Sequence, residues 1–229
     1  MSNLAIIPAR GGSKRIPKKN IKEFLGKPII AYSIKAAIES GLFDEIMVST
    51  DDEEIRNISI KYGAKVPFLR TNKNSDDYAT LADVANEVIN NYNLQGVYFE
   101  NVCCILPTAP LIKPHSIIKG YFKLQEGSFN SVCPVVKFTY PILRALEISV
   151  DGKLKMVWPE HIKTRSQDLK TAYHDSGSFY WIKTEALKKE GTFFCNQGTA
   201  IILNESEVQD IDTMDDWRIA ELKYHITHG

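Results

Sequence analysis

The alternation of short apolar runs with segments of helical spacing constrains this chain most strongly. The apolar runs have the length of buried strands, and the segments between them repeat apolar residues at the intervals of an amphipathic helix. Strands that alternate with helices favour the α/β class, a mainly parallel sheet with helices on both faces. The expected strands are 4–8, 45–49, 66–69, 102–106, 131–136, 178–182 and 199–203. The expected helices are 29–40, 52–62, 78–93, 114–125 and 213–225.

One domain with a single interruption is expected. The length of 229 residues suits one undivided α/β domain over 1–229. Between about 140 and 175 the alternation breaks, with prolines at Pro141 and Pro159 and a turn at Asp151-Gly152. This stretch predicts an excursion from the sheet, built as a hairpin with loops.

Composition argues against several classes of partner. A formal net charge of +0 gives no broad basic excess, so we expect no nucleic acid partner. No apolar run approaches the roughly 18 residues that cross a bilayer, and the N-terminus lacks a signal-peptide pattern. We therefore expect no membrane contact and a cytoplasmic location. The four cysteines lack metal-binding spacing and are expected to be reduced core residues.

A basic loop with two glycines follows the first expected strand. Gly11 and Gly12 lack a Cβ, so their amide N–H groups are able to face a phosphate. Ser13 adds a hydroxyl donor, and Arg10 and Lys14 add positive charge. Because ligands collect at the carboxyl ends of parallel strands, this loop predicts a phosphate site. The alternative is a solvated basic turn, and neither a dinucleotide G-x-G-x-x-G nor a P-loop pattern is present.

Two aspartates precede the last expected helix. In an extended segment Asp210 and Asp212 point to the same side, while Ile211 points to the other. Two carboxylates are able to receive a hard divalent cation such as Mg²⁺ when phosphate oxygens and waters complete the shell. The alternative is a polar strand end with capping duties. Together with the basic loop, the pair favours metal-dependent chemistry on a nucleoside triphosphate.

Several segments resemble the acylneuraminate cytidylyltransferase family, whose members activate eight- and nine-carbon keto-sugar acids. The resemblance begins with I-I-P-A-R-G-G-S-K-R-I-P-K-K-N at 6–20 and then G-K-P-I-I-A-Y-S-I and V-S-T-D-D-E-E-I. It continues with F-L-R at 68–70, D-Y-A-T at 77–80, P-T-A-P at 107–110 and Q-D-I-D-T at 209–213, so it covers nearly the whole chain. Segments 164–168, 172–177 and 179–181 are most similar to the branch that activates pseudaminic acid.

This resemblance implies a Rossmann-like fold of the nucleotide-diphospho-sugar transferase type, in which the excursion serves dimerisation. It implies CTP and a nine-carbon keto-sugar acid as substrates, Mg²⁺ as cofactor, pyrophosphate as product and a homodimer. Arg10 and Lys14 would stabilise the departing pyrophosphate, and Asp210 and Asp212 would hold the metal; these four are the expected catalytic residues. The expected nucleotide-binding residues are Arg10, Gly11, Gly12, Ser13, Lys14, Asn20, Arg70, Thr80, Pro107, Thr108 and Ala109.

The sugar pocket is expected to combine aromatic faces with polar groups. Arg144 or Arg165 would meet the sugar carboxylate, in one arrangement from the partner subunit of the dimer. Core packing is the alternative for Phe179 and Tyr180, and a structural role is the alternative for His174. The full expected set is Arg144, Arg165, Gln167, Tyr173, His174, Asp175, Phe179 and Tyr180.

The expected function is the synthesis of a CMP-sugar, CMP-pseudaminic acid first, from CTP and a nonulosonic acid. Sialic, legionaminic and ketodeoxyoctonic acids are the alternative sugars. Sialic acid members often carry Gln-Pro-Thr-Ser-Pro where this chain has Leu106 and the residues after it, which disfavours sialic acid. A non-catalytic homologue that binds nucleotide or sugar is a further alternative, and an RNA-binding protein is disfavoured by the neutral charge.

Overall fold

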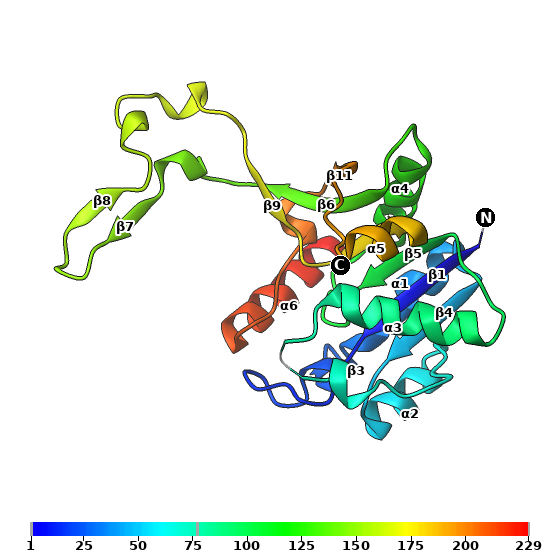
Figure 1. Cartoon of the computed structure of the whole chain (residues 1–229). Helices are drawn as coiled ribbons and strands as arrows, with labels where there is room; N and C mark the ends of the chain where they lie inside the picture. Colours follow the sequence, from blue (N-terminus) through cyan, green and yellow to red (C-terminus); the bar gives the residue numbers. More distant parts are fainter. Residues whose placement is uncertain (1, 77, 229) are drawn as a thin grey trace.

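The computed structural model describes residues 2–76 and 78–228. A seven-stranded sheet lies at its centre, with the strand order β11-β6-β10-β5-β1-β4 and with β9 paired to β6 (Figure 1). The strands of this sheet are β1 (Asn3–Pro8), β4 (Glu45–Ser49), β5 (Asn101–Ile105), β6 (Ser131–Lys137), β9 (Tyr173–Asp175), β10 (Phe179–Lys183) and β11 (Gly198–Ile202).

The directions of the strands bring several carboxyl ends to one edge of the sheet. β1 runs parallel to β4 and β5, and β11 runs parallel to β6. β10 lies between β5 and β6 and is antiparallel to both, so β5 and β6 share one direction. The sheet is mixed around a mainly parallel core, which confirms the expected α/β class. Loops that follow β1, β4, β5 and β11 therefore meet at the same edge.

Helices cover both faces of this sheet because its strands carry apolar side chains on both sides. Along β1, Ile7 belongs to the core cluster on one face and Ile6 to the cluster on the other. The first face packs against α1 (Ile30–Ser40), α2 (Glu53–Lys61) and α4 (Pro114–Gln125). The second face packs against α3 (Leu81–Leu94) and α5 (Thr184–Glu190).

The structure differs from the expected elements in a few places. The strand expected at 66–69 is wrong: only Lys65 bridges to Met47, and Pro67 lacks the N–H that a longer ladder needs. The helix expected from residue 78 begins at Leu81, since Thr80 caps it. The sequence patterns also missed α5 and the short hairpin of β2 (Glu23–Phe24) and β3 (Lys27–Pro28).

The last helix, α6 (Met214–His228), begins as expected after Thr213. The Asp216 amide donates to the Thr213 hydroxyl over 3.2 Å, and the Thr213 amide donates to the Asp216 carboxylate over 2.7 Å. This reciprocal cap satisfies backbone donors that a helix start leaves unpaired. No helix among the described residues is long and apolar enough to span a bilayer.

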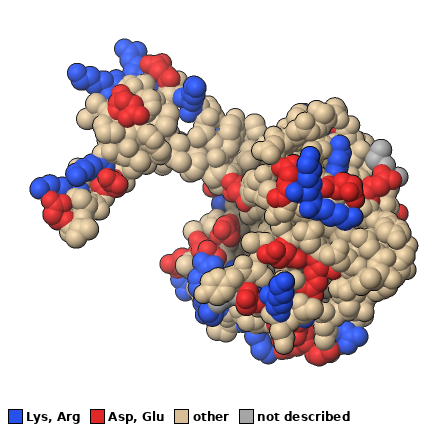
Figure 2. Space-filling view, viewed as in Figure 1, with Lys and Arg blue, Asp and Glu red and all other residues tan. Residues whose placement is uncertain are grey.

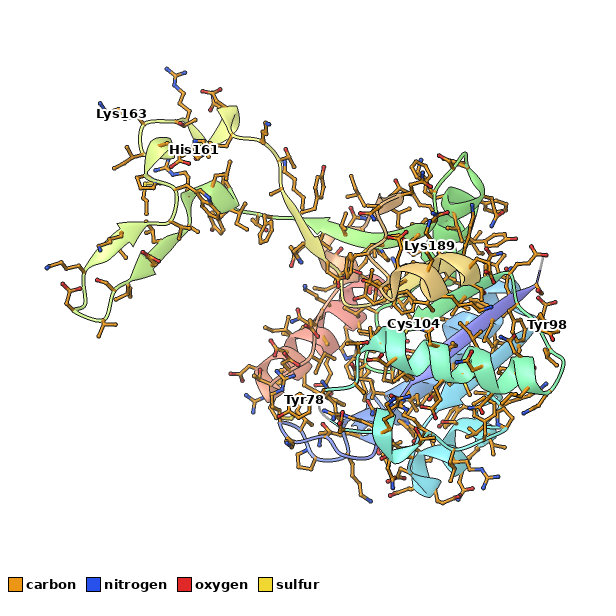
Figure 3. The ribbon with its side chains drawn as sticks, viewed as in Figure 1. Tyr78, Tyr98, Cys104, His161, Lys163 and Lys189 are labelled. Atoms are coloured by element: carbon orange, nitrogen blue, oxygen red, sulfur yellow. The ribbon has the colours of Figure 1, made fainter. Side chains whose placement is uncertain are left out.

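Residues 138–172, here called the arm, leave the sheet after β6 and return to it as β9. The arm projects away from the sheet and contains the two-stranded hairpin of β7 (Leu146–Ile148) and β8 (Leu154–Met156) (Figure 1). His161 and Lys163 of the arm lie far from Cys104 at the centre of the sheet (Figure 3). Basic and acidic side chains are interspersed on the face seen in Figure 2, on the arm as on the core.

Candidate active site

A pocket of about 430 Å³ opens at the carboxyl edge of the sheet. Pro8 at the end of β1 and Pro107 and Thr108 after β5 form part of its wall, and the basic loop forms the rest. Two other pockets, of about 610 and 620 Å³, lie along α3 and between α4 and β11, but neither has as many cations. The pocket of about 430 Å³ is lined by Pro8, Arg10, Ser13, Lys14, Arg15, Lys19, Asn20, Pro107 and Thr108.

Hydrogen bonds to neighbouring loops hold the basic loop in place. The buried Asn20 side chain donates to the Arg10 carbonyl over 2.9 Å, which closes the loop upon itself. The Arg10 guanidinium donates to the Asp76 carbonyl over 2.9 Å. The Gly11 amide, expected to face a phosphate, instead donates to the Asp51 carboxylate over 2.9 Å. The first glycine therefore anchors the loop to the segment after β4, and this part of the phosphate prediction needs correction.

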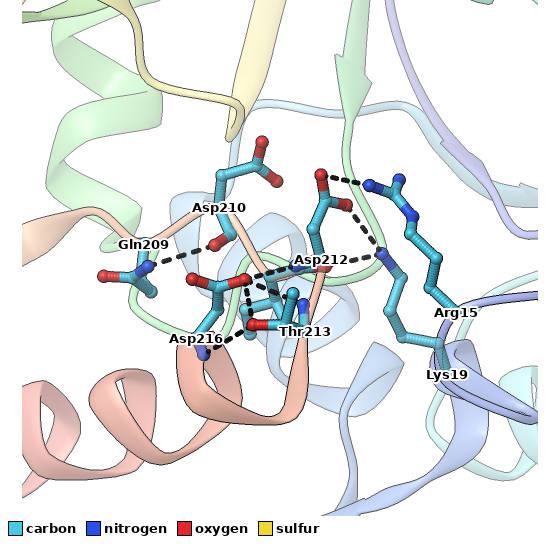
Figure 4. A network of polar contacts seen from close by, with 8 residues as sticks. Arg15, Lys19, Gln209, Asp210, Asp212, Thr213 and Asp216 are labelled. Atoms are coloured by element: carbon cyan, nitrogen blue, oxygen red, sulfur yellow. Dashed lines mark hydrogen bonds and ion pairs between the residues drawn. The ribbon is translucent and has the colours of Figure 1, made fainter. Parts of the chain in front are cut away.

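The basic loop and the late aspartates lie side by side, as Figure 4 shows. The Arg15 guanidinium is 2.5 Å from the Asp212 carboxylate, and the Lys19 ammonium is 3.7 Å from it. Lys19 also donates to the Ile211 carbonyl over 2.6 Å. Cations that line the pocket thus contact the segment of Asp210 and Asp212, although these residues lie nearly at opposite ends of the chain. Arg15 and Lys19 were not among the expected site residues.

Burial and charge act in opposite directions on the ionisable groups here. Burial lowers the pKa of Lys19, and the negative charge of Asp212 opposes this shift. The pKa of Asp210 is raised, first by desolvation and then by repulsion from Asp212. Asp210 has substantial exposed area, but protein atoms around its carboxyl still displace part of its hydration. In Figure 4 its carboxylate has no drawn contact to the other residues shown.

The two carboxylates suit a metal whose other ligands come from elsewhere. Among the described residues no cluster of three or more His, Cys, Asp or Glu side chains is arranged for metal binding. Mg²⁺ prefers one or two carboxylates together with waters and substrate phosphates, and the donor set of Asp210 and Asp212 fits that preference.

Other expected nucleotide-binding residues lie outside this pocket wall. Arg70 is buried and donates to the Ser49 hydroxyl over 3.0 Å, so it supports the end of β4. Burial lowers its pKa, and the charge of Asp51 counteracts the effect. The Thr80 hydroxyl is engaged with Asp83 in the cap of α3, and Ala109 packs in the core. Gly12 is exposed on the basic loop beside Ser13, and Asp77 of the D-Y-A-T segment lies outside the described residues.

The expected sugar-binding residues of β9 and β10 divide into two groups. Tyr173, His174 and Asp175 line a second pocket of about 440 Å³. The Asp175 carboxylate accepts from the Tyr180 hydroxyl over 2.5 Å and from the Gly177 amide over 3.0 Å, so it also holds the turn between the strands. Phe179 is fully buried in the core and offers no surface to a ligand.

The second pocket contains two aromatic residues that the sequence patterns missed. Phe193 and Phe194 follow α5 and line the pocket together with Tyr173 and His174. Phe194 is 62% exposed, whereas Phe193 is buried, and two adjacent phenylalanines after a Gly-Thr pair were the only sequence signal. Gly177, in the turn after β9, lies beside the Asp210 side chain, because a Cβ at Gly177 would lie 3.6 Å from Asp210 Cγ.

The remaining expected sugar-binding residues lie on the arm. The Arg144 guanidinium donates to the Thr164 carbonyl over 3.4 Å, and Arg165 and Gln167 lie in the exposed segment after it. Because the arm projects from the sheet, these residues stand apart from the pocket of their own chain (Figure 1). The structure thus groups the cations and carboxylates at one edge but does not bring the arginines of the arm to them.

Sequence comparison assigns the chain to a class. The cytidylyltransferase family profile matches residues 4–216, and the chain belongs to this family. A pseudaminic acid cytidylyltransferase of Campylobacter jejuni strain 81-176 is 44% identical over 228 residues, which cover 100% of this chain and 98% of that protein. A CMP-N,N'-diacetyllegionaminic acid synthase of Legionella pneumophila is 36% identical and covers 96% of this chain and 95% of its own length.

Structural comparison supports the same fold. A CMP:2-keto-3-deoxy-manno-octonic acid synthetase solved with CTP superposes with a TM-score of 0.70 at 15% identity and covers 99% of both chains. A 4-diphosphocytidyl-2C-methyl-D-erythritol synthase of Anaerococcus prevotii gives a TM-score of 0.64 at 15% identity. At such low identity these similarities concern the fold alone.

Proposed function

We propose that this protein is a Mg²⁺-dependent cytidylyltransferase that joins CTP to a nonulosonic acid and gives the CMP-sugar and pyrophosphate. Pseudaminic acid is the proposed sugar, because the Campylobacter relative is named for it and is similar over its full length. The contact of the cation-lined pocket with the Asp212 segment is the structural observation that carries the proposal. It combines positive charge for a polyphosphate with carboxylates for a hard metal.

The reaction is a displacement at the α-phosphorus of CTP. The anomeric hydroxyl of the sugar forms a new O–P bond and loses its proton, while the bond to the β-phosphate breaks and pyrophosphate leaves. Such a transfer needs in-line positioning and neutralisation of charge more than a protein nucleophile. Arg10 and Lys14 in the pocket wall would neutralise the leaving pyrophosphate. Arg15 and Lys19, which contact Asp212, would share that task.

Asp210 and Asp212 would hold the metal, with substrate phosphate oxygens and waters as the further ligands. A bound Mg²⁺ supplies Lewis-acid polarisation of the phosphate and lowers the barrier to attack. In the described structure Arg15 and Lys19 neutralise Asp212, and Asp210 keeps a desolvated carboxyl with a raised pKa. Asp210 therefore has the stronger electrostatic reason to accept a cation.

We propose that the pocket beside β9 receives the sugar. Tyr173 and Phe194 would provide aromatic faces for the apolar side of a deoxy sugar, and His174 would provide a polar group. Gly177, two residues after the pocket residue Asp175, lies beside Asp210, which suits a sugar that must reach the α-phosphate. Arg144 and Arg165 would serve the sugar carboxylate from the arm of a second subunit.

A homodimer is proposed from the state of the arm. Its hairpin has only two strands, which are marginally stable alone in water. Apolar side chains on the arm are exposed, among them Tyr140 at 83% and Ile148 at 74%. A second copy of the chain would cover them and bring Arg144 and Arg165 near its sugar pocket. We also propose a cytoplasmic location, consistent with four buried free cysteines.

A purified-protein assay with CTP, Mg²⁺ and a panel of keto-sugar acids tests the function. Pyrophosphate release should be fastest with pseudaminic acid and much slower with sialic, legionaminic and ketodeoxyoctonic acids. If pyrophosphate release is fastest with another sugar, the proposed reaction stands but the proposed sugar substrate is wrong. If CTP–Mg²⁺ raises the melting temperature but no sugar gives pyrophosphate release, a non-catalytic homologue is favoured instead, because a specific ligand stabilises a protein without turnover.

A further inference from the structure

Each of the two charged segments of the site has one buried isoleucine, and both isoleucines enter the same core cluster. Ile16 follows Arg15 in the basic loop and is 1% exposed. Ile211 separates Asp210 from Asp212 and is 0% exposed. The α6 cluster, as we name it, joins them to residues of the β2–β3 hairpin, α1 and α6. Its buried members are Ile16, Phe24, Ile29, Ile211, Trp217 and Ala220.

Phe24 is at the centre of the aromatic part of the α6 cluster. Its ring meets the edge of Trp217 at 5.6 Å between centroids, and it meets Tyr32 at 5.3 Å and Tyr224 at 5.9 Å. The Tyr32 hydroxyl donates to the Phe24 carbonyl over 2.7 Å, which fixes the hairpin against α1. Leu25, in the turn of this hairpin, has a positive φ of 46° and packs against the same cluster. A non-glycine residue persists in this conformation only where its surroundings hold it.

Trp217 connects the cluster to the start of α6. Its amide donates to the Thr213 carbonyl over 3.1 Å, so its backbone lies one helical turn after Thr213, and its indole N–H donates to the Glu221 carboxylate over 3.1 Å. The Lys22 ammonium lies 5.8 Å from the centre of the indole ring, on the chain segment that follows the basic loop. The Trp217 ring thus packs in the cluster that contains Ile16 and Ile211, and its backbone bonds to Thr213, the residue after Asp212.

We propose that the α6 cluster is a positioning element, in which Trp217 and Ile211 set the distance between the basic loop and the carboxylate pair. The inference rests on the proposed function. A polyphosphate held by cations on one side and by a metal on two carboxylates on the other requires both sides at a fixed spacing. Misplacement by about 1 Å is enough to cost a large factor in rate. Close packing transmits a change in ring size to both segments.

Trp217→Phe is the main test, because it shortens the ring that packs on Phe24 and leaves every charge of the site unchanged. CTP affinity is measured by calorimetry with and without Mg²⁺, and kcat is measured by pyrophosphate release. The Mg²⁺-dependent gain in CTP affinity and kcat are each expected to fall about tenfold or more, while affinity without Mg²⁺ changes little. A purely structural role would lower the melting temperature without this selective loss.

Trp181→Phe is the matched control. Trp181 is also fully buried, stacks on Phe43 at 5.1 Å and donates to the Ile117 carbonyl over 3.0 Å, in the core cluster on the sheet face covered by α4. We expect this variant to lose stability but to keep the Mg²⁺-dependent gain and kcat within about twofold. Equal losses in both variants would overturn the positioning role, and so would no selective loss in Trp217→Phe.

Ile211→Val keeps the proposal testable if Trp217→Phe does not fold. This change removes one carbon between the two aspartates, and Ile34→Val in α1 is its control of equal size and burial. A fall of about threefold in the Mg²⁺-dependent gain for Ile211→Val alone supports positioning, and equal behaviour of the two variants overturns it. If the unchanged protein shows no Mg²⁺-dependent CTP binding, the proposed function fails together with this inference. If the unchanged protein shows Mg²⁺-dependent CTP binding but the variants show no selective loss, only the inference is refuted.

Discussion

Asp212→Asn separates the proposed metal-binding role of this residue from its part in stability. The substitution removes one negative charge and keeps the size of the side chain. In the folded protein Asp212 pairs with Arg15 at 2.5 Å, but the two side chains are 38% and 66% exposed. Exposed ion pairs contribute about 0–1 kcal/mol, so the melting temperature should fall by about 4 °C at most.

The expected loss of activity is much larger. A group that stabilises charge only in the transition state is worth about 2.7–4 kcal/mol, which corresponds to a fall of about 10²–10³ in kcat. Pyrophosphate release at saturating CTP and sugar measures this loss, and circular dichroism confirms the fold. Asp215→Asn is the matched control, because Asp215 pairs with Arg218 at 2.9 Å with side chains 83% and 72% exposed. Near-normal release by Asp212→Asn, or an equal loss in the control, would refute the catalytic role.

Three further substitutions test separate parts of the site. Lys14→Ala should lower the rate about a hundredfold at saturating CTP, because leaving-group stabilisation is lost; an unchanged saturated rate contradicts this. Asp210→Asn should abolish Mg²⁺-dependent release but leave the melting temperature at pH 7 unchanged or higher. Because the pKa of Asp210 is raised, this carboxyl stabilises the fold fully below its ordinary pKa of 3.8, and the contribution is lost as pH rises through the raised pKa. A marked drop in the melting temperature of Asp210→Asn at pH 7 would contradict this prediction. Gly11→Ala would bring a Cβ within 2.7 Å of the Asp52 carboxylate, so KM for CTP should rise severalfold in steady-state kinetics, and an unchanged KM would show that the loop tolerates the shift.

Some features of this protein follow from the sequence pattern, and others depend on contacts that the pattern does not contain. The strands and helices were predictable because burial on both sheet faces produces apolar runs and helical spacing. The reversed direction of β10 was not, since side-chain alternation is the same in parallel and antiparallel strands. The meeting of the basic loop with Asp212 was expected from strand ends at one sheet edge and from family resemblance. The engagement of the Gly11 amide with Asp51 depends on where the β4–α2 loop lies, and no local signal encodes that.

The arm begins and ends at two hydrogen-bonded neighbours, since the Phe138 amide donates to the Ala172 carbonyl over 3.1 Å just beyond the β6–β9 pairing. Its two roots are therefore as close together as the ends of an ordinary hairpin loop. Because the two ends of the arm are adjacent, we expect that the arm can be lengthened, shortened or replaced without changing the register of the strands in the sheet. With the proposed roles of the arm in subunit contact and in binding the sugar carboxylate, a change in either would leave the proposed triphosphate site of the core unaltered.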